Sequence, residues 1–331
     1  MNFTHFTAGT DDDGRRLDKI LQKFLADEHR SSLYKSLRKG LIKLDGKKCD
    51  GSARVHAGSD IQIADLLLKG NSAPQKTESQ AKKLDESLIV LKNESILILN
   101  KPYDTAVQPS KNAHDGSLSE LVQADYEARH KERTSLSFKT GPLHRLDRKT
   151  TGLIAFSQNL MGAQWFSASI KAHTTQKIYL ALIEGHLAET QEWEDSISKN
   201  ESDSAHSFHT VRVHASEDGK RALTTAKPLA YGTLRKKELT LAAFFIKTGR
   251  THQIRSQSAY HGFPLLGDTA YGGTQFSEPG ISQTLFLHAY ELRFPRDNPL
   301  SLPERVRAPL SDDFQKILDK ILINRDSLLI I

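Results

Sequence analysis

The chain is organised around the stretch Pro142-Leu143-His144-Arg145-Leu146-Asp147-Arg148-Lys149-Thr150-Thr151-Gly152. The apolar segment that follows it, Leu153–Phe156, is typical of a buried strand. A proline before and a glycine after indicate a loop of defined shape. Asp147 is the one carboxylate among two arginines, a lysine and a histidine, and nearby positive charge favours its ionised form. Such an anion either holds an arginine in place or attacks an electrophile beside a bound phosphate, and the stretch alone leaves both interpretations open.

Length and composition predict a globular protein. The chain has 331 residues, enough for two domains, with 37% hydrophobic and 26% charged residues. Cys49 is the only cysteine, so an intrachain disulfide is excluded and a reducing compartment is the simplest setting. The first residues show no secretory signal, and no apolar run approaches the roughly 20 residues that span a bilayer. We therefore expect a soluble, cytoplasmic protein without a membrane partner, and a monomer by default.

Positive charge is concentrated near the N-terminus. The chain carries a net charge of +6, and residues 14–70 hold 13 Lys and Arg against 7 Asp and Glu, whereas the remainder holds 33 of each. This excess favours a polyanion-binding module, although a solvated basic surface kept for solubility explains the charge equally well.

The basic segment predicts two helices and a small sheet. Apolar residues recur at helical spacing between Leu17 and Leu25, and a second short helix follows Ser31-Ser32, either of which can cap it. Asp45-Gly46 predicts a tight turn between strands. Five basic residues then lie within reach of one face: Arg16, Arg30, Lys35, Arg38 and Lys39.

The order of these features resembles the small RNA-binding domain first named in a ribosomal small-subunit protein. The motifs that carry the resemblance are Arg16-Leu17-Asp18-Lys19, Arg38-Lys39-Gly40, Asp45-Gly46-Lys47 and Gly58-Ser59-Asp60-Ile61. The resemblance implies an α/β RNA-binding domain over residues 1–66 that docks on structured RNA through its basic residues. Residues 67–87 are polar without an apolar period, and we interpret them as a flexible linker.

Residues 88–331 predict an α+β domain. Apolar segments such as 88–91, 96–99, 177–185 and 239–246 are typical of strands, and their irregular, partly hairpin connections favour a mixed sheet over repeated βαβ units. Helices are predicted over 118–128, 161–172, from 251 to about 261, and over 312–322. Residues 189–210 are polar and acidic, and we expect them to form a surface excursion outside the core.

Three pieces of this domain together resemble the RluA-type pseudouridine synthases. They are His144-Arg145-Leu146-Asp147 with Thr150 and Gly152, the Lys177–Tyr179 strand, and Gly249-Arg250-Thr251-His252-Gln253-Ile254-Arg255; Asn100-Lys101-Pro102 and Gly267-Asp268 are further matches. The resemblance covers about residues 88–310 and implies the pseudouridine synthase fold, a mixed, mostly antiparallel central sheet flanked by helices. Two departures are Thr151, where serine is usual, and Tyr103-Asp104, where a pair such as Ser-Gly is common.

The resemblance also implies roles for individual residues. Asp147 is the catalytic carboxylate, Arg255 pairs with it, and Tyr179 stacks on the uracil and can move the proton on ring carbon 5. Arg145 fills the gap left by the extruded base, or else contacts a phosphate. The complete substrate-binding set is Arg145, His144, Lys177, Arg250, His252, Asn100 and Lys101. No cofactor is expected, and the histidines lack the spacing of metal ligands.

The implied function is therefore isomerisation of uridine in RNA, with large-subunit ribosomal RNA as the expected substrate and transfer RNA as the alternative. A non-catalytic ribosome-assembly factor on the same fold is a second class, and the presence of Asp147, Tyr179 and Arg255 speaks against it. A glycoside hydrolase is a third class, but that chemistry normally needs two opposed carboxylates, and only one stands in the motifs.

Overall fold

The computed structural model describes residues 1–25, 29–68, 83–109, 116–130, 135–199, 210–214 and 219–321. The chain divides into two compact units. The first contains Met1–Leu84, Ser119–Gly141 and Ser157–Ala163, and the second contains Asp85–Leu118, Pro142–Phe156 and Gln164–Ile331. The predicted domain limits, 1–66 and 88–331, stay predictions, and most of the predicted linker (69–82) lies outside the described residues.

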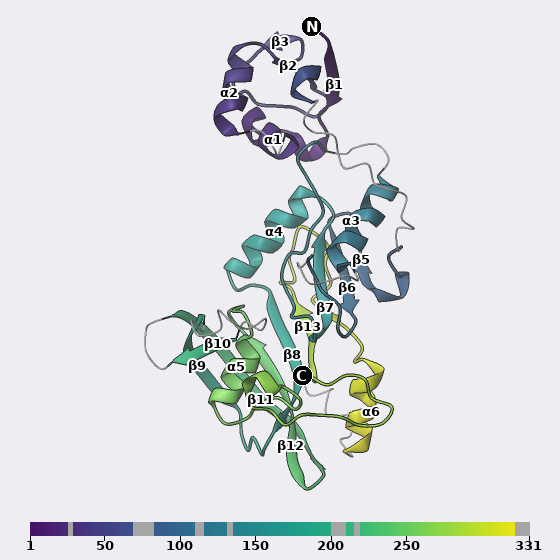
Figure 1. Cartoon of the computed structure of the whole chain (residues 1–331), viewed down its shortest axis with the longest axis vertical. Helices are drawn as coiled ribbons and strands as arrows, with labels where there is room; N and C mark the ends of the chain where they lie inside the picture. The colour runs from purple at the N-terminus through teal and green to yellow at the C-terminus, as the bar shows by residue number, and fades with distance from the viewer. Residues whose placement is uncertain are drawn as a thin grey trace. The chain divides into compact units, whose positions relative to one another are not determined.

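The N-terminal part of the first unit is a four-stranded antiparallel sheet with two helices (Figure 1). The strand order is β1-β4-β2-β3, with β1 at Phe3–Thr7, β4 at Asp60–Ala64, β2 at Ile42–Leu44 and β3 at Lys47–Lys48. The helices are α1 (Leu17–Phe24) and α2 (Arg30–Arg38); α3 (Leu118–Arg129) lies almost wholly in the same unit. The predicted periodicity holds, because Leu17, Ile20 and Leu21 are buried in a common core.

The predicted cap of α2 is wrong. The helix begins at Arg30, so Ser31 and Ser32 lie inside its first turn. His29 takes the extended N-cap conformation instead, and its carbonyl accepts the N–H of Leu33 at 3.1 Å. The predicted turn at Asp45-Gly46 is present, since both residues have positive φ angles, of 49° and 76°.

The second unit is built on a ten-stranded sheet in the order β10-β9-β11-β12-β8-β13-β7-β6-β5, with β14 paired to β13. In chain order the strands are β5 (Ile89–Lys92), β6 (Ile96–Lys101), β7 (Thr151–Ser157), β8 (Gln176–Glu184), β9 (Gln191–Lys199), β10 (Val211–His214), β11 (Lys220–Leu234), β12 (Lys237–Ile246), β13 (Leu287–Arg293) and β14 (Arg305–Arg307). Most pairs are antiparallel, whereas β7 pairs with β13 in parallel. The mixed α+β sheet that the sequence predicts is confirmed.

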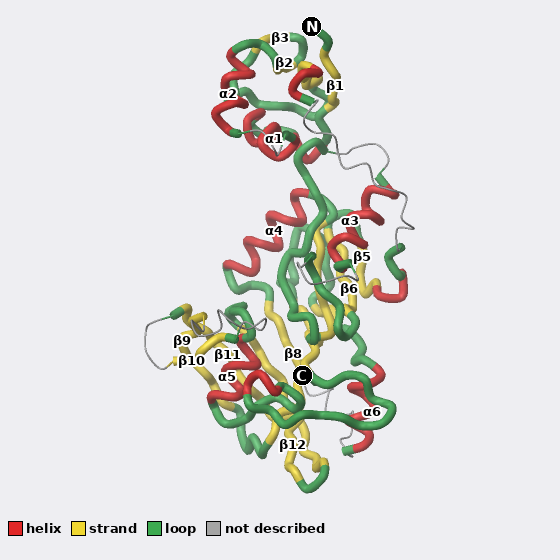
Figure 2. The backbone as a smooth tube through the Cα atoms, in the orientation of Figure 1, coloured by secondary structure: helices red, strands yellow, loops and turns green. Residues whose placement is uncertain are grey.

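Among the described residues, α5 (Gln253–Tyr260) and α6 (Asp312–Lys320) belong to this unit, together with α4 (Leu160–Lys171) from Gln164 onward. Alternation along β8 divides its side chains between two faces. Ile178, Leu180 and Leu182 share a core cluster with Phe314 and Ile317 of α6, so Lys177 and Tyr179 point to the opposite face. Figure 2 shows that the segments between α5 and β13 are mostly loop.

The expected surface excursion at 189–210 is wrong over the part that the structure describes. Residues 191–199 form β9, which pairs with β11 inside the large sheet. Trp193, Asp195 and Ile197 alternate as buried residues and are 2%, 9% and 5% exposed. Charged residues between and beside them hid the strand's period of two, and residues 200–209 lie outside the described chain.

Candidate active site

The loop that carries Asp147 is fixed to the strand that follows it. The N–H of Leu143 donates to the carbonyl of Ala155 at 2.8 Å, and the N–H of Thr150 donates to the carbonyl of Asp147 at 3.0 Å. Gly152 has a φ of 103°, and a Cβ there would lie 2.3 Å from the carbonyl oxygen of Ala289 on β13. Only glycine permits this approach, which sets the start of β7 and thereby the place of Asp147.

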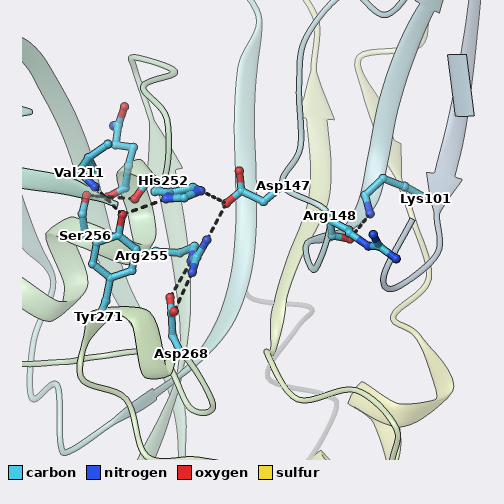
Figure 3. Close-up of polar contacts among 10 residues, drawn as sticks. Lys101, Asp147, Arg148, Val211, His252, Arg255, Ser256, Asp268 and Tyr271 are labelled. Atoms are coloured by element: carbon cyan, nitrogen blue, oxygen red, sulfur yellow. Dashed lines mark hydrogen bonds and ion pairs between the residues drawn. The ribbon is translucent and has the colours of Figure 1, made fainter. Parts of the chain in front are cut away.

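Arg255 on α5 joins two carboxylates. Its Nε and one terminal nitrogen each donate to Asp268 at 2.7 Å, and the other terminal nitrogen donates to Oδ2 of Asp147 at 3.3 Å (Figure 3). The Asp268 side chain is 2% exposed and that of Asp147 is 29% exposed. Burial opposes the positive charge, but the hydrogen bonds that Arg255 donates to Asp268 raise the pKa of Arg255 above its usual range. Arg255 is therefore a permanent cation, fixed by one buried carboxylate and presented to an accessible one.

His252 approaches the same oxygen of Asp147 from a second direction. Its Nε2 lies 3.6 Å from Oδ2 of Asp147, and its Nδ1 lies 2.9 Å from the hydroxyl of Tyr271. The backbone of His252 has a φ of 52°, in the left-handed region, and Ser256 donates its hydroxyl to the His252 carbonyl at 3.0 Å. Burial lowers the pKa of His252, although Asp147 acts in the opposite direction.

Tyr179 and Lys177 lie on the face of β8 opposite the one that packs on α6. Tyr179 is 7% exposed, and burial together with the Asp147 charge raises the pKa of its hydroxyl. Lys177 is 9% exposed, and burial lowers the pKa of its ammonium. A Cβ on Gly249 would lie 3.1 Å from the Lys177 ammonium, so that lysine reaches the loop before α5.

Three of the predicted substrate-binding residues bond mainly to backbone. Lys101 is completely buried and its ammonium donates to the carbonyls of Pro102, Thr105 and Arg148. The Nε2 of His144 accepts the N–H of Ala155 at 3.1 Å, and burial lowers its pKa to about 3. The Asn100 amide donates to the carbonyl of Pro309 at 3.1 Å. These contacts support positioning roles more than direct RNA contacts.

Three arginines lie on the surface around Asp147. Arg145 and Arg250 are exposed, and Arg250 donates to the carbonyl of Arg221 at 3.0 Å. Arg148 donates to both carboxylate oxygens of Asp104, at 2.8 Å and 3.2 Å. Asp104 has a φ of 55°, a left-handed conformation that is uncommon outside glycine.

The basic residues predicted to bind RNA lie on or beside two helices, α1 and α2. Lys35, Arg38 and Lys39 are exposed on or just after α2, whereas the Arg30 side chain lies outside the described set. Arg16 pairs with the buried carboxylate of Asp18, whose pKa it lowers to about 2. A groove of about 420 Å³ beside α1 is lined by Asp13, Gly14, Arg15, Arg16, Lys19, Gln22, Lys23 and Arg54.

Sequence reasoning left several of these residues without a role. Asp268 and Tyr271 were given no role in the site, although Gly267-Asp268 was one of the matches that carry the family resemblance; for Tyr271 the signal was only the Gly-rich segment that contains it. Lys19 and Lys23 are four residues apart on α1, a spacing that places both on one side of the helix, and Arg15, just before the helix, lines the same groove. Within the described ranges, no group of three or more His, Cys, Asp or Glu side chains is placed to hold a metal ion, and no helix is long and apolar enough to cross a membrane.

Comparison with known proteins connects this geometry to one family. A family model described as RNA pseudouridylate synthase matches residues 95–260. The chain belongs to this family. The matched range contains the whole Asp147 loop, β8 and α5, whereas Asp268 and Tyr271 lie beyond its end.

Relatives and a solved structure agree with the assignment to this synthase family. Ribosomal large subunit pseudouridine synthase C of Vibrio cholerae is 30% identical over 317 residues, which cover 93% of each chain. The protein of the same name from Vibrio vulnificus is 28% identical over 94% of each chain. The structure of human RNA pseudouridylate synthase domain containing 1 covers 73% of this chain and 92% of its own, with 26% identity and a TM-score of 0.54. The chain is thus an isomerase of the pseudouridine synthase family that acts on RNA.

Proposed function

We propose that this enzyme converts specific uridines of large-subunit ribosomal RNA to pseudouridine. The observation that carries the chemistry is the accessible Asp147 carboxylate, held by the fixed cation of Arg255 and close enough to the buried Tyr179 for its charge to act on that hydroxyl. The similarity to two ribosomal large subunit pseudouridine synthases, along nearly the full length of each, supports the choice of RNA. Transfer RNA is the alternative substrate.

The reaction detaches uracil from ribose, turns it, and rejoins it through ring carbon 5, so it needs no redox change. Asp147 is the catalytic carboxylate, acting on the sugar either by attack or by assisting glycal formation. A carboxylate is already ionised at neutral pH, so the site must supply orientation rather than activation. Arg255 supplies that orientation, because Asp268 holds its Nε and one terminal nitrogen and leaves the other to Asp147.

Tyr179 has the properties of a neutral aromatic wall. Its raised pKa keeps the hydroxyl protonated at neutral pH, so the ring can stack on uracil, and the hydroxyl oxygen can take the proton from ring carbon 5 only if its own proton passes to another acceptor in the same step. Lys177 lies beside it and reaches the loop of Arg250, which fits a contact with the RNA backbone. Arg145 is exposed next to Asp147, where a planar cation can replace the extruded base or bind a phosphate.

The N-terminal unit is proposed to bind structured RNA. Its groove presents Arg15, Arg16, Lys19, Lys23 and Arg54 against one carboxylate, Asp13, and adds to the exposed cations of α2. Contacts to phosphates from such residues supply affinity and position without reading sequence. A monomeric, cytoplasmic enzyme stays our prediction.

The geometry favours isomerisation over glycoside hydrolysis. Hydrolysis normally uses a second carboxylate near the scissile bond. Asp268 is the nearest candidate, but it is 2% exposed and both of its oxygens accept bonds from Arg255. An assay for free uracil separates the two reactions, since a hydrolase releases the base and an isomerase does not.

The test of function is pseudouridine mapping across all RNAs of cells that lack the protein, with wild type or Asp147→Ala reintroduced. We expect defined sites in large-subunit ribosomal RNA to disappear and to return only with wild type. Sites in transfer RNA would move the proposal to the alternative substrate. Sites that return with Asp147→Ala would refute the role of Asp147, and no change at any site would favour a non-catalytic assembly factor.

A further inference from the structure

Tyr271 joins its own segment to β10 and to the start of α5 through one hydroxyl. Its oxygen accepts the backbone N–H of Val211 on β10 at 2.9 Å and lies 2.9 Å from Nδ1 of His252. Its ring packs against the guanidinium of Arg255, with 5.1 Å between the guanidinium carbon and the ring centroid. The residue therefore contacts both side chains that approach Asp147, although it does not itself touch that carboxylate (Figure 3).

The hydrogen bonds of this hydroxyl decide which nitrogen of His252 carries the proton. A phenol has one proton to donate, and the Val211 N–H can only donate to its oxygen. Among the described residues, His252 Nδ1 is the acceptor within hydrogen-bond distance of that hydroxyl. The arrangement that satisfies every group has the Tyr271 hydroxyl donating to a bare Nδ1, so the proton of the neutral ring lies on Nε2.

The opposite tautomer is disfavoured at both ends of the ring. A proton on Nδ1 would have to donate to the Tyr271 oxygen, and the hydroxyl proton would lose its acceptor. At the other end, a bare Nε2 lone pair would face the Asp147 carboxylate oxygen 3.6 Å away, so two acceptors would oppose each other. Charged groups near the ring are Asp147, Asp268, Arg255 and Arg145, and burial outweighs their combined influence in keeping the ring neutral.

We propose that Tyr271 is a positioning residue that locks His252 as a donor from Nε2, so that His252 and Arg255 together hold one oxygen of Asp147 and leave the other to react. Both contacts fall on Oδ2, at 3.6 Å and 3.3 Å. Figure 3 shows the second oxygen turned away from both donors. The His252 contact is longer than a hydrogen bond, as catalytic contacts often are before substrate binds. This inference rests on the proposed function of Asp147 and assigns to His252 a partner other than RNA.

The direct test reads the tautomer by nitrogen-15 NMR of the full chain labelled at histidine, with His252 assigned from its absence in His252→Gln. Wild type should show a protonated Nε2 and a bare Nδ1, and Tyr271→Phe should show a mixture or the reverse. A protonated Nδ1 in wild type, or no change in Tyr271→Phe, would overturn the proposal. This measurement needs no RNA, so it decides the tautomer even if the proposed substrate is wrong.

The functional test measures single-turnover pseudouridine formation and binding on an unmodified large-subunit ribosomal RNA transcript. Tyr271→Phe keeps the ring against Arg255, so we expect the rate constant to fall about tenfold while the RNA Kd changes less than about twofold. The matched control is Tyr260→Phe, which removes a hydroxyl from an exposed tyrosine at the end of α5 and should leave the rate unchanged.

A double-mutant comparison separates positioning from general damage. A glutamine amide can donate from near the place of Nε2 and needs no tautomer lock, so Tyr271→Phe should cost less than about twofold when added to His252→Gln. If Tyr271→Phe lowers the rate constant equally in the wild-type and His252→Gln backgrounds, the positioning role of Tyr271 is refuted. An unchanged rate constant in Tyr271→Phe alone would refute it as well. If wild type does not modify the transcript at all, the proposed substrate is wrong. The NMR measurement still decides which ring nitrogen of His252 carries the proton.

Discussion

Lys101→Met should change how the stability of the larger unit depends on pH. Lys101 is 0% exposed, and its ammonium donates to three carbonyls at 3.0, 2.9 and 2.8 Å. Burial lowers the pKa of this ammonium from 10.5 to about 7, although the charges of Asp147 and Asp104 act in the opposite direction. The side chain therefore holds its proton more weakly in the folded chain than in the unfolded chain.

The sign of the effect follows from that difference. Between pH 7 and about 10.5 the unfolded chain keeps the lysine proton while the folded chain releases it, so the free energy of unfolding rises with pH across this window. At about 1.4 kcal/mol for each pH unit, the lysine adds up to about 5 kcal/mol between the two limits. Lys101→Met removes this term, and the variant should gain correspondingly less stability than wild type on going from pH 7 to pH 10.

Denaturant unfolding at both pH values measures this difference. Both tryptophans of the chain, Trp165 and Trp193, lie in the larger unit, so their fluorescence follows its unfolding separately from the N-terminal unit. Lys92→Met, at an exposed lysine on β5, controls for the loss of a positive charge. Equal pH dependence in wild type and Lys101→Met would refute a buried lysine that loses its proton on folding. A low stability of Lys101→Met at pH 7 would not refute it, because each protein is compared with itself at two pH values.

Two further predictions concern RNA affinity. Asp104→Asn should weaken the ion pair that holds the half-exposed Arg148 and leave more of its charge for a phosphate, which tightens RNA binding and steepens its dependence on salt by up to about one unit of log–log slope; an unchanged slope in filter-binding titrations would show that Arg148 does not reach RNA. Replacing both Lys19 and Lys23 by alanine should weaken binding and flatten the same slope by about two units, whereas Lys236→Ala in the larger unit serves as the control. Equal slopes for the double variant and wild type would place RNA away from the groove.

The sequence predicts those parts of the fold that carry a clear local pattern. The apolar run of β8 and the helical spacing of α1 are each visible within ten residues, and the structure confirms both. The strand β9 escaped prediction because its inward residues include Asp195, whose burial depends on distant partners. Its carboxylate accepts the Gln257 amide at 2.6 Å and contacts His261 at 3.0 Å, contacts that no local pattern shows.

The site shows the same division between local pattern and tertiary contact. The pairing of Arg255 with Asp147 was implied by motif resemblance, and the structure places the two in contact at 3.3 Å. Lys101 was expected to bind substrate, but a lysine in a loop motif gives no sign that its ammonium is enclosed by carbonyls. Tyr271 meets its partners only when its own segment, β10 and the start of α5 come together in the fold, so the sequence alone does not show its contribution.

The order of strands in the large sheet has a consequence for how activity arises during folding. Asp147 precedes β7 and Arg255 follows β12, and 108 positions of chain separate the two residues. The strands between their elements include β13, which comes near the end of the chain and pairs with both β7 and β8. Such distant pairings form slowly, because the entropy cost of closing a long loop must be met before any stabilising contact forms. A chain still emerging from synthesis therefore has the N-terminal residues that we propose to bind RNA long before it has a reactive centre, and catalytic activity requires the completed sheet.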